Sequence, residues 1–393
     1  MSEPSGRLVA LMAAGCALAV STLYYHQPLL AQMAATFGLT PTQASPVATL
    51  TQLGYAVGLL LIVPLADARQ PRRLAGLAIA ANALALLACA LAPSFVLLCA
   101  ASFAVGVTAI TAQLIIPTLA GAASPANRGR VVGSLLGGLS SGLLLARTLG
   151  GLLGAHAGWQ AVFAMAALVD LALLALVTRG LPLTTPKTKM GYAALLRSLA
   201  SLLREEPVLR VCAASGLLMF AAFSALWASL AALLSQPPYA FGPATIGLLG
   251  LVALLGILAS PRIGALADRL GTRRTVGLGV GSLVAGFVLV ADGGHSLAAL
   301  MLGMVLLDLG NRAGLVANQA RVQALRPEAR SRLNTVFMCA YFLGGAAGAA
   351  LGSYGAHRAG WVGLAAVGGA LAGAAGAVNA LARATRLDQD PRG

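Results

Sequence analysis

The chain has 393 residues, of which 59% are hydrophobic and only 9% are charged, whereas a soluble domain is about a quarter charged. A soluble core of this length cannot bury so much apolar surface, so the composition excludes a soluble enzyme. Hydrophobicity also excludes a disordered chain, and the unbroken apolar runs are unlike the alternating strands of an outer-membrane barrel. The net charge of +15 does not indicate nucleic-acid binding, because the basic residues lie in short loops between apolar runs. We therefore predict a polytopic helical membrane protein.

Twelve apolar runs are long enough to cross the hydrocarbon core as helices, which takes about 20 residues each. The expected spans lie at about residues 8–37, 44–66, 74–92, 95–120, 131–155, 159–177, 208–234, 246–267, 276–291, 297–325, 333–356 and 361–381. They predict an N-terminal six-helix bundle over residues 1–178, a cytoplasmic linker over 179–207 and a C-terminal six-helix bundle over 208–393. Tyr192, Leu195 and Leu199 share one helical face of the linker, which indicates an interfacial amphipathic helix or else a plain solvated linker.

Basic residues alternate from loop to loop along the chain. The loops after the even-numbered spans hold them, as in Arg69, Arg72, Arg73, Arg128, Arg130, Arg269, Arg273, Arg274, Arg326, Arg330 and Arg332, whereas the loops after spans 1, 3, 5, 7 and 9 hold none. Arg358 is the exception. The positive-inside rule therefore places both termini and the central linker in the cytoplasm. A composition rich in Ala, Gly and Arg but poor in Lys favours a bacterial source, and hence the inner membrane.

The two halves repeat each other at an offset of about 201–202 residues. The matching elements are Asp67, Arg72 and Arg73 with Asp268, Arg273 and Arg274, Pro125, Arg128 and Arg130 with Pro327, Arg330 and Arg332, and Gly158-Trp159 with Gly360-Trp361. Each element falls at the same place in its own half. Parallel repeats of six spans are a known transporter architecture.

The run from Gly264 to Arg274 resembles the signature loop of the major facilitator superfamily, and it lies between the second and third helices of its half. The segments 24–30 and 326–334 resemble stretches of the bacterial drug:proton antiporter-like branch. The first half departs from the signature at Val63, Ala68 and Gln70, and span 5 lacks the Gly-Pro antiporter motif. The resemblance implies an all-α fold of twelve transmembrane helices in two six-helix bundles.

The same resemblance implies a cytoplasmic gate that latches the outward-facing state. The gate residues it implies are Asp67, Arg72, Arg73, Asp268, Arg269, Arg273 and Arg274. An acid near a neighbouring helix N-terminus is favoured by the helix dipole, and arginine can bind it in a bidentate manner. The alternative is that these charges only set the topology.

Placing an ionisable side chain inside the bilayer costs free energy, so each such residue is a candidate functional residue. In span 10, the polar side chains follow helical spacing along one face: Asp308, Asn311, Arg312, Asn318 and Gln319. Such a row faces a cavity or another helix, and Asp308 and Arg312 are close enough to pair within one turn. Asp308 is therefore a candidate proton-coupling residue and the others candidate substrate-binding residues, unless the two form a permanent, silent salt bridge.

Span 1 carries Tyr24, Tyr25, His26 and Gln27 before Pro28. Aromatic rings can stack on a flat organic substrate and attract cations, although these residues also suit an aromatic belt at the outer interface. His26 titrates near physiological pH and is a second candidate for proton coupling, or else a packing histidine.

Arg147 in span 5 borders the central cavity by family resemblance, and Asp170 in span 6 is either its support or its buried ion-pair partner. Gln113, Trp227, Gln52 and Tyr55 are further candidate lining residues.

These features favour a secondary transporter that exports a small organic molecule by proton-coupled alternating access. An importer or facilitator of sugars, amino acids or organic acids is the alternative, and a non-transporting membrane sensor is a third. We expect no enzyme activity, no cofactor and no metal, because no catalytic constellation is visible and the five cysteines lack metal-site spacing. The expected partners are the substrate, protons and membrane lipid around a monomer, with no nucleic acid.

The loop charges generate a testable topology. Tags placed at either terminus or within residues 179–207 should report the cytoplasm when reporter-enzyme fusions are assayed in intact cells. Cleavage of the 179–207 segment by a protease added outside intact cells would contradict the two-bundle topology.

Overall fold

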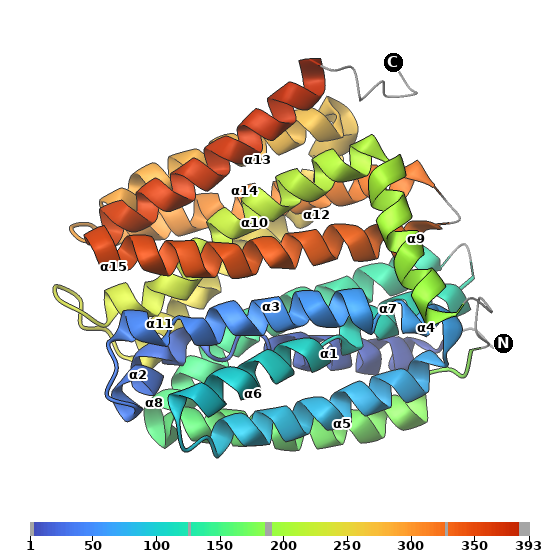
Figure 1. Ribbon diagram of the computed structural model, residues 1–393, viewed down its shortest axis with the longest axis horizontal. Coiled ribbons are helices and arrows are strands. Elements are labelled where there is room, and N and C mark those ends of the chain that lie inside the picture. Colours follow the sequence, from blue (N-terminus) through green and yellow to red (C-terminus); the bar gives the residue numbers. More distant parts are fainter. Residues whose placement is uncertain (1–3, 125–126, 185–190, 327–328, 385–393) are drawn as a thin grey trace. The chain divides into compact units, whose positions relative to one another are not determined.

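The computed structural model describes residues 4–124, 127–184, 191–326 and 329–384 (Figure 1). Within these ranges, the regular elements are α-helices and short 3-10 helices, with no strand. The chain forms two compact units: Met1–Leu196 with Phe241–Gly250, and Arg197–Ala240 with Leu251–Gly393. We refer to them as unit 1 and unit 2.

Unit 1 contains most of the first predicted bundle. Its helices are α1 (Gly6–Ser21), η1 (Gln27–Leu29), α2 (Leu30–Thr36), η2 (Pro41–Ala44), α3 (Pro46–Leu61), α4 (Leu65–Ala68), α5 (Pro71–Ala90), α6 (Phe95–Thr108), α7 (Thr111–Ala122), α8 (Arg128–Gly180) and α11 (Pro243–Leu249). Helix α8 packs against α1 and α5, and α3 packs against α6.

Unit 2 repeats this pattern with fewer breaks. Its helices are α10 (Pro207–Leu234), α12 (Ala253–Leu270), α13 (Thr272–Ala291), α14 (Leu297–Leu325) and α15 (Arg330–Ala384). Helix α10 packs along α15, and α13 packs along α14. Helix α9 (Tyr192–Glu205) begins in unit 1 and ends in unit 2, and η3 (Gly250–Val252) lies at the other crossing.

Helix α9 is bonded at each end to the unit in which that end lies. The Tyr192 hydroxyl donates to the Leu61 carbonyl oxygen at 2.8 Å. At the other end, Arg326 contacts the carboxylates of Glu205 at 3.1 Å and Glu206 at 2.6 Å. Hydrogen bonds from the Ser201 hydroxyl and from Arg326 hold the pKa of Glu205 below its usual value. The linker helix is therefore held by side chains as well as by its connections to the chain.

Several predicted spans are interrupted helices. The expected first span, 8–37, is broken between α1 and η1, and the fourth, 95–120, is broken between α6 and α7. In contrast, α14 has the predicted bounds 297–325. Eight helices of the described ranges are long and apolar enough to cross a membrane, and the predicted total of twelve spans stays a prediction.

Two very long helices each contain two predicted spans. Helix α8 has 53 residues and α15 has 55, so either one, if straight, would be about 80 Å long against a hydrocarbon core of about 30 Å. Non-helical backbone interrupts them at Gly158, with φ 82°, and at Gly360, with φ 56°. Only glycine adopts such angles readily. The repeated Gly-Trp pair of the sequence thus marks the same break in both units.

Glycines also set the closest helix contacts in each unit. A Cβ added at Gly138 or Gly142 of α8 would lie 2.1 Å from a carbonyl oxygen of α1. In unit 2, a Cβ at Gly344 or Gly348 of α15 would lie 2.0 Å from a carbonyl oxygen of α10. Small residues allow membrane helices to approach closely, and here they do so at equivalent places in the repeat.

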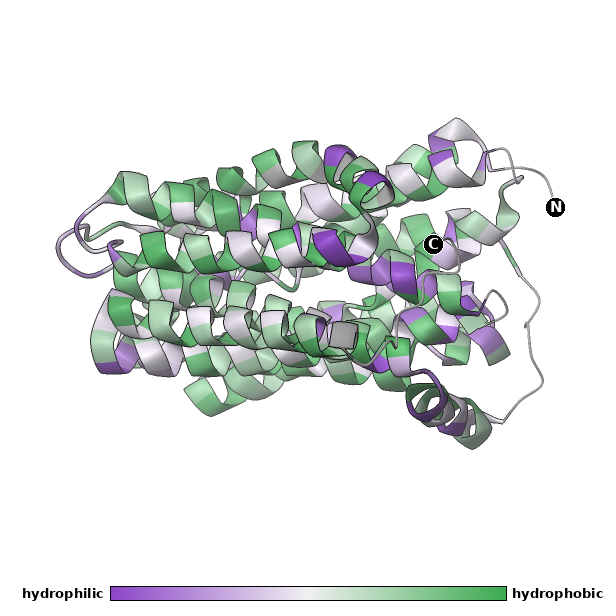
Figure 2. Ribbon diagram, turned by 90° about the horizontal axis from the view of Figure 1, so that it is seen from above, coloured by the Kyte–Doolittle hydropathy of each residue, from purple (hydrophilic) through white to green (hydrophobic). Residues whose placement is uncertain are grey.

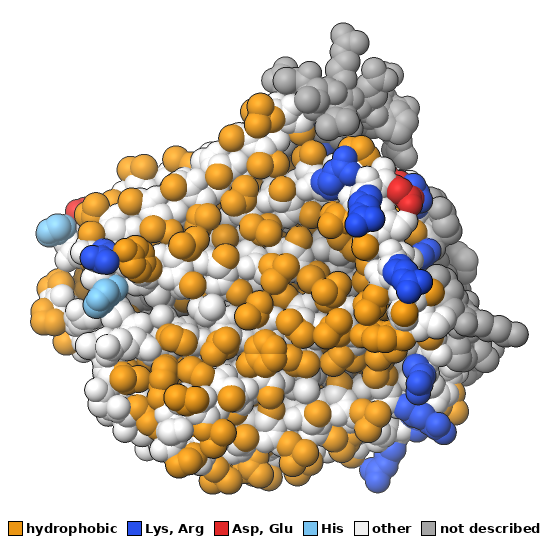
Figure 3. Space-filling view, in the orientation of Figure 1, with side chains coloured by type: hydrophobic (Ala, Val, Ile, Leu, Met, Phe, Trp, Pro, Cys, Tyr) orange, Lys and Arg blue, Asp and Glu red, His pale blue; other side chains and the backbone are white. Residues whose placement is uncertain are grey.

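The flanks of the helices are apolar, as expected of surfaces that face lipid. Figures 2 and 3 show hydrophobic residues along the helices and polar residues mostly at helix ends and loops. On α5 and at its C-cap, Leu77, Leu84 and Leu91 recur every seventh position and are 70%, 69% and 71% exposed. A soluble protein rarely exposes such a stripe, so this face is one that lipid covers.

The α1–α8 contact can be tested with two glycines of one helix. Gly142→Ala should lower the free energy of unfolding by about 1–3 kcal/mol, because the added methyl group would meet the α1 backbone. Gly137→Ala has no neighbouring atom within 4 Å of its new Cβ and should leave stability unchanged or raise it. Thermal unfolding of the two variants in detergent measures the difference, and equal melting temperatures would contradict this packing.

Candidate functional site

The break in the first span places four predicted site residues in unit 1. Helix α1 ends at Ser21, and the chain continues in turns to Gln27 and Pro28 at the start of η1. The Ser21 hydroxyl is within hydrogen-bond distance of the Ala17 and Gly142 carbonyl oxygens, at 2.8 and 2.9 Å. This anchors the end of α1 to α8 where the helix stops.

The side chains at this break are buried. Tyr24 and Tyr25 are each 6% exposed, Gln27 is 5% exposed and His26 is 2% exposed. Among the described residues, the His26 Nε2 atom has no hydrogen-bond partner. These residues therefore do not form an exposed aromatic belt in unit 1.

Arg147 of α8 lies against this break and is 1% exposed. Its Nε atom donates to Gln27 Oε1 at 2.7 Å, and its guanidinium carbon lies 5.6 Å from the centre of the Tyr24 ring. A buried guanidinium needs such partners because it stays protonated. Asp170, further along α8, is 2% exposed.

A segment that the sequence analysis placed in the second half covers Arg147. Helix α11 packs on α8, where the Thr148 hydroxyl donates to the Gly247 carbonyl oxygen at 3.3 Å. A Cβ at Gly247 would lie 2.5 Å from the Arg147 carbonyl oxygen, and one at Gly250 would lie 2.8 Å from the Arg147 Cβ. Gly247 and Gly250 are the sequence feature that could have predicted this close packing, but the chain has so many glycines that this pair does not stand out.

Gln113 and Tyr55, two further candidates, contact each other in unit 1. The Gln113 Nε2 atom of α7 donates to the Tyr55 hydroxyl oxygen of α3 at 3.3 Å. Tyr55 is 1% exposed, and Gln52, one turn earlier on α3, is 5% exposed.

In unit 2, the predicted polar row of α14 is present and pairs as expected. Arg312 Nε donates to Asp308 Oδ2 at 3.0 Å, and the two side chains are 13% and 4% exposed. The pair lies within one helical turn, so it forms without help from another helix. This geometry suits both a coupling site and a silent salt bridge.

The rest of the row binds side chains that the sequence analysis did not identify. Asn311 exchanges hydrogen bonds with the Tyr341 hydroxyl at 3.0–3.1 Å. Asn318 donates to the Ser215 hydroxyl oxygen at 3.2 Å, and Gln319 donates to Asn334 Oδ1 at 2.8 Å. The partners lie on α10 and α15, so only the packing of three helices brings them together.

Trp227 lies on α10 at the end of a series of aromatic rings. Its ring is 6.3 Å from that of Phe223, which stacks near Phe220 at 6.0 Å. Phe220 stacks on Tyr341 with 4.0 Å between ring centres and 12° between planes. Trp227 is thus connected through aromatic contacts to the tyrosine that binds Asn311.

The predicted gate residues lie at helix ends. Arg273 Nη2 donates to the Asn379 carbonyl oxygen at 2.8 Å, which joins the start of α13 to α15. Arg72 and Arg73 line a pocket between α5 and α8. Asp67 lies in α4, and Arg269 and Arg274 are exposed. The side chain of Asp268 is outside the described part of the structure.

Comparison with known proteins agrees with this architecture. The sequence profile of the Major Facilitator Superfamily matches residues 10–236 and 212–392. The chain is 38% identical over 371 residues to the uncharacterized transporter YgaY of Escherichia coli, covering 94% of each chain. It is 34% identical over 381 residues to a probable transporter of Streptomyces coelicolor, covering 94% of this chain and 88% of that one. The chain belongs to the major facilitator superfamily, and it is a multi-pass membrane transporter.

Solved structures show the same fold at low sequence identity. The human organic anion transporter TETRAN has a TM-score of 0.72 and 21% identity, covering 96% of this chain and 100% of that one. A bacterial homolog of the human lysosomal transporter Spinster has a TM-score of 0.69 and 16% identity, covering 98% of both chains.

The partners of Arg147 can be separated by double-mutant cycles. Arg147→Gln and Gln27→Leu should be coupled by about 0.5–3 kcal/mol in unfolding free energy, because the two side chains share a buried hydrogen bond. Arg147→Gln and Asp170→Asn should add within about 0.5 kcal/mol. Denaturant unfolding of purified variants measures both cycles. Recovery of stability in the second double variant would instead identify a buried ion pair.

Proposed function

We propose that the protein exports a small organic molecule from a bacterial cytoplasm, coupled to protons, by alternating access of its two bundles. The superfamily assignment supports transport. The efflux direction is supported by the resemblance of segments 24–30 and 326–334 to drug:proton antiporters. A protein named "Probable sugar efflux transporter" from Pasteurella multocida, 27% identical over 245 residues, is also consistent with it, at 62% coverage of this chain and 58% of that one.

The single observation that carries proton coupling is the Asp308–Arg312 pair of α14. The Asp308 carboxylate is almost fully buried, and its contact with Arg312 at 3.0 Å stabilises its charged form. Protonation of Asp308 would remove that attraction and release the guanidinium to bind another group. The pair therefore has two states that differ by one proton, as a coupling site requires.

Candidate substrate contacts are present in each unit. In unit 1 they are Tyr24, Tyr25, Gln27, Gln113 and Arg147, with His26 as an additional proton carrier. In unit 2 they are Trp227, Asn311, Arg312, Asn318 and Gln319. Amides and aromatic rings together suit a small organic molecule with a flat apolar part and a few polar groups.

We propose that the loop charges act in the gating of this cycle. Asp67, Arg72 and Arg73 would serve unit 1, and Asp268, Arg269, Arg273 and Arg274 would serve unit 2. The Arg273–Asn379 bond supports this role, because it couples the start of α13 to the end of α15. In this scheme both termini and the α9 linker face the cytoplasm, and the transporter functions as a monomer in the inner membrane.

Asp308→Asn should abolish uphill transport driven by a pH gradient but leave downhill exchange partly intact. Asparagine has nearly the same shape as aspartate, but it cannot take up or release a proton. Asp292→Asn is the matched control, since the Asp292 side chain is 57% exposed in a loop. A thermal-shift screen of sugars, amino acids, organic anions and organic cations first selects a stabilising compound. Proteoliposomes containing a trapped pH-sensitive dye then report proton movement beside uptake of that compound.

The outcomes separate the candidate functions. Normal proton-driven transport by Asp308→Asn would exclude Asp308 as the coupling residue and leave His26 to be tested. Counterflow that is independent of any proton gradient in the unmodified protein would favour a facilitator. Binding without movement into liposomes would favour a sensor.

A further inference from the structure

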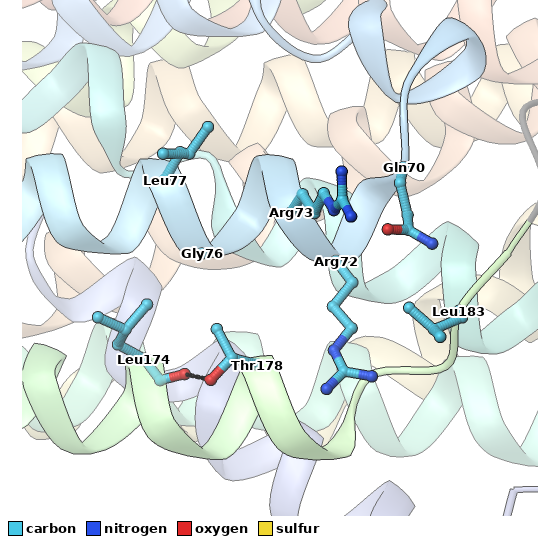
Figure 4. A pocket seen from close by; sticks show the side chains of 8 residues that line it. All are labelled: Gln70, Arg72, Arg73, Gly76, Leu77, Leu174, Thr178 and Leu183. Atoms are coloured by element: carbon cyan, nitrogen blue, oxygen red, sulfur yellow. Dashed lines mark hydrogen bonds between the residues drawn. The ribbon is translucent and has the colours of Figure 1, made fainter.

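A pocket of about 750 Å³ lies in unit 1, where the start of α5 meets the end of α8 (Figure 4). Arg72, Arg73 and Thr178 contribute polar groups to its wall. Leu77, Leu174 and Leu183 contribute the apolar part. The transport proposal assigns Arg72 and Arg73 to the gate but gives no role to the space that they line.

Within the part of the chain that the structure describes, no acidic side chain pairs with these two arginines. Throughout the described ranges, the side chains of Arg72 and Arg73 make no hydrogen bond and no ion pair. Arg73 is exposed and Arg72 is half-buried. In Figure 4, Arg72 extends from α5 into the space between Thr178 and Leu183.

The N-terminus of α5 adds to the positive charge of the two arginines. The helix begins at Pro71, has no side-chain cap and has no acidic residue in its first turn. The partial positive charge of a helix N-terminus favours an anion there, whereas two arginines in the first turn oppose it. A bound anion would therefore relieve both the dipole and the guanidinium charges.

At the corresponding position in unit 2, the arginine is bonded to the neighbouring helix. In the internal repeat, Arg72 corresponds to Arg273 and Thr178 to Asn379, each about 201 residues further on. Arg273 donates to the Asn379 carbonyl oxygen at 2.8 Å, and Asn379 Nδ2 donates back to the Arg273 carbonyl oxygen at 3.4 Å. In unit 1, the Thr178 hydroxyl instead donates to Leu174 of its own helix at 2.6 Å.

The apolar side of the pocket indicates which anion it takes. Leu77 is 70% exposed and Leu183 is 60% exposed, and Leu77 belongs to the apolar stripe of α5 that lipid covers. A soluble phosphate would gain nothing from these leucines, whereas a phospholipid would place its acyl chains on them. Basic pockets between membrane helices bind anionic lipid headgroups on the same principle.

We propose that this pocket binds an anionic glycerophospholipid of the cytoplasmic leaflet, with its phosphate on Arg72 and Arg73 and its acyl chains on Leu77, Leu174 and Leu183. The inference concerns lipid binding, and its test does not depend on whether Arg72 and Arg73 also act in gating.

The test uses full-length protein purified in detergent and dioleoyl phosphatidylglycerol as the probe. Native mass spectrometry and thermal shift should show saturable binding of this lipid, with a raised melting temperature. The Arg72→Gln/Arg73→Gln variant should bind it about 30-fold more weakly, since each basic group near a lipid surface contributes about 1 kcal/mol. The matched control is Arg130→Gln/Arg332→Gln, which removes the same charge outside the pocket.

A second measurement locates the acyl chains. In Leu77→Trp, phosphatidylglycerol with brominated chains should quench the new tryptophan more strongly than brominated phosphatidylcholine does. The difference should vanish when Arg72 and Arg73 are also replaced by glutamine.

Three results would overturn the proposal. Equal lipid affinity in the pocket variant and the control would show that the arginines are not the site. Equal binding of phosphatidylcholine would show only a general lipid surface. Stabilisation by inorganic phosphate at the same concentration as the lipid, lost in the pocket variant, would make this a site for a soluble anion.

Discussion

A charged or hydrogen-bonding side chain inside the membrane has no water to bind, so it must find its partners within the protein. Arg147 has Gln27 as a hydrogen-bond acceptor for its Nε atom and the face of the Tyr24 ring beside its guanidinium. Asp308 and Arg312 satisfy this constraint with each other. The break after α1 follows from the same requirement, because it places Gln27 and Tyr24 beside α8, where the guanidinium needs them.

The same constraint explains the glycines. Polar side chains on neighbouring helices can bond only if the helix axes come close, and a Cβ at Gly142 or Gly348 would prevent this. In unit 2, the packing of α14 against α15 brings Asn311 within reach of Tyr341. Glycine contacts and buried polar contacts are therefore two parts of one arrangement, repeated in both units.

The units also differ where their repeated sequences diverge. Arg273 binds the backbone carbonyl oxygen of Asn379, whereas the equivalent Arg72 lines a pocket beside Thr178. The two units, which share one internal repeat, thus differ at equivalent helix ends.

The sequence by itself determined the class of protein, the superfamily and the position of most helices, because apolar run length and loop charge are local properties. It also identified the α14 row and the Asp308–Arg312 pair, since both lie on one helix with known periodicity. Only the tertiary structure decided that Gln27 binds Arg147, that Tyr341 binds Asn311 and that α11 packs over α8 in unit 1. These contacts join segments more than 25 residues apart, between helices whose faces no periodicity relates. Their pairing depends on how close the helices come and how each is rotated, and packing sets both.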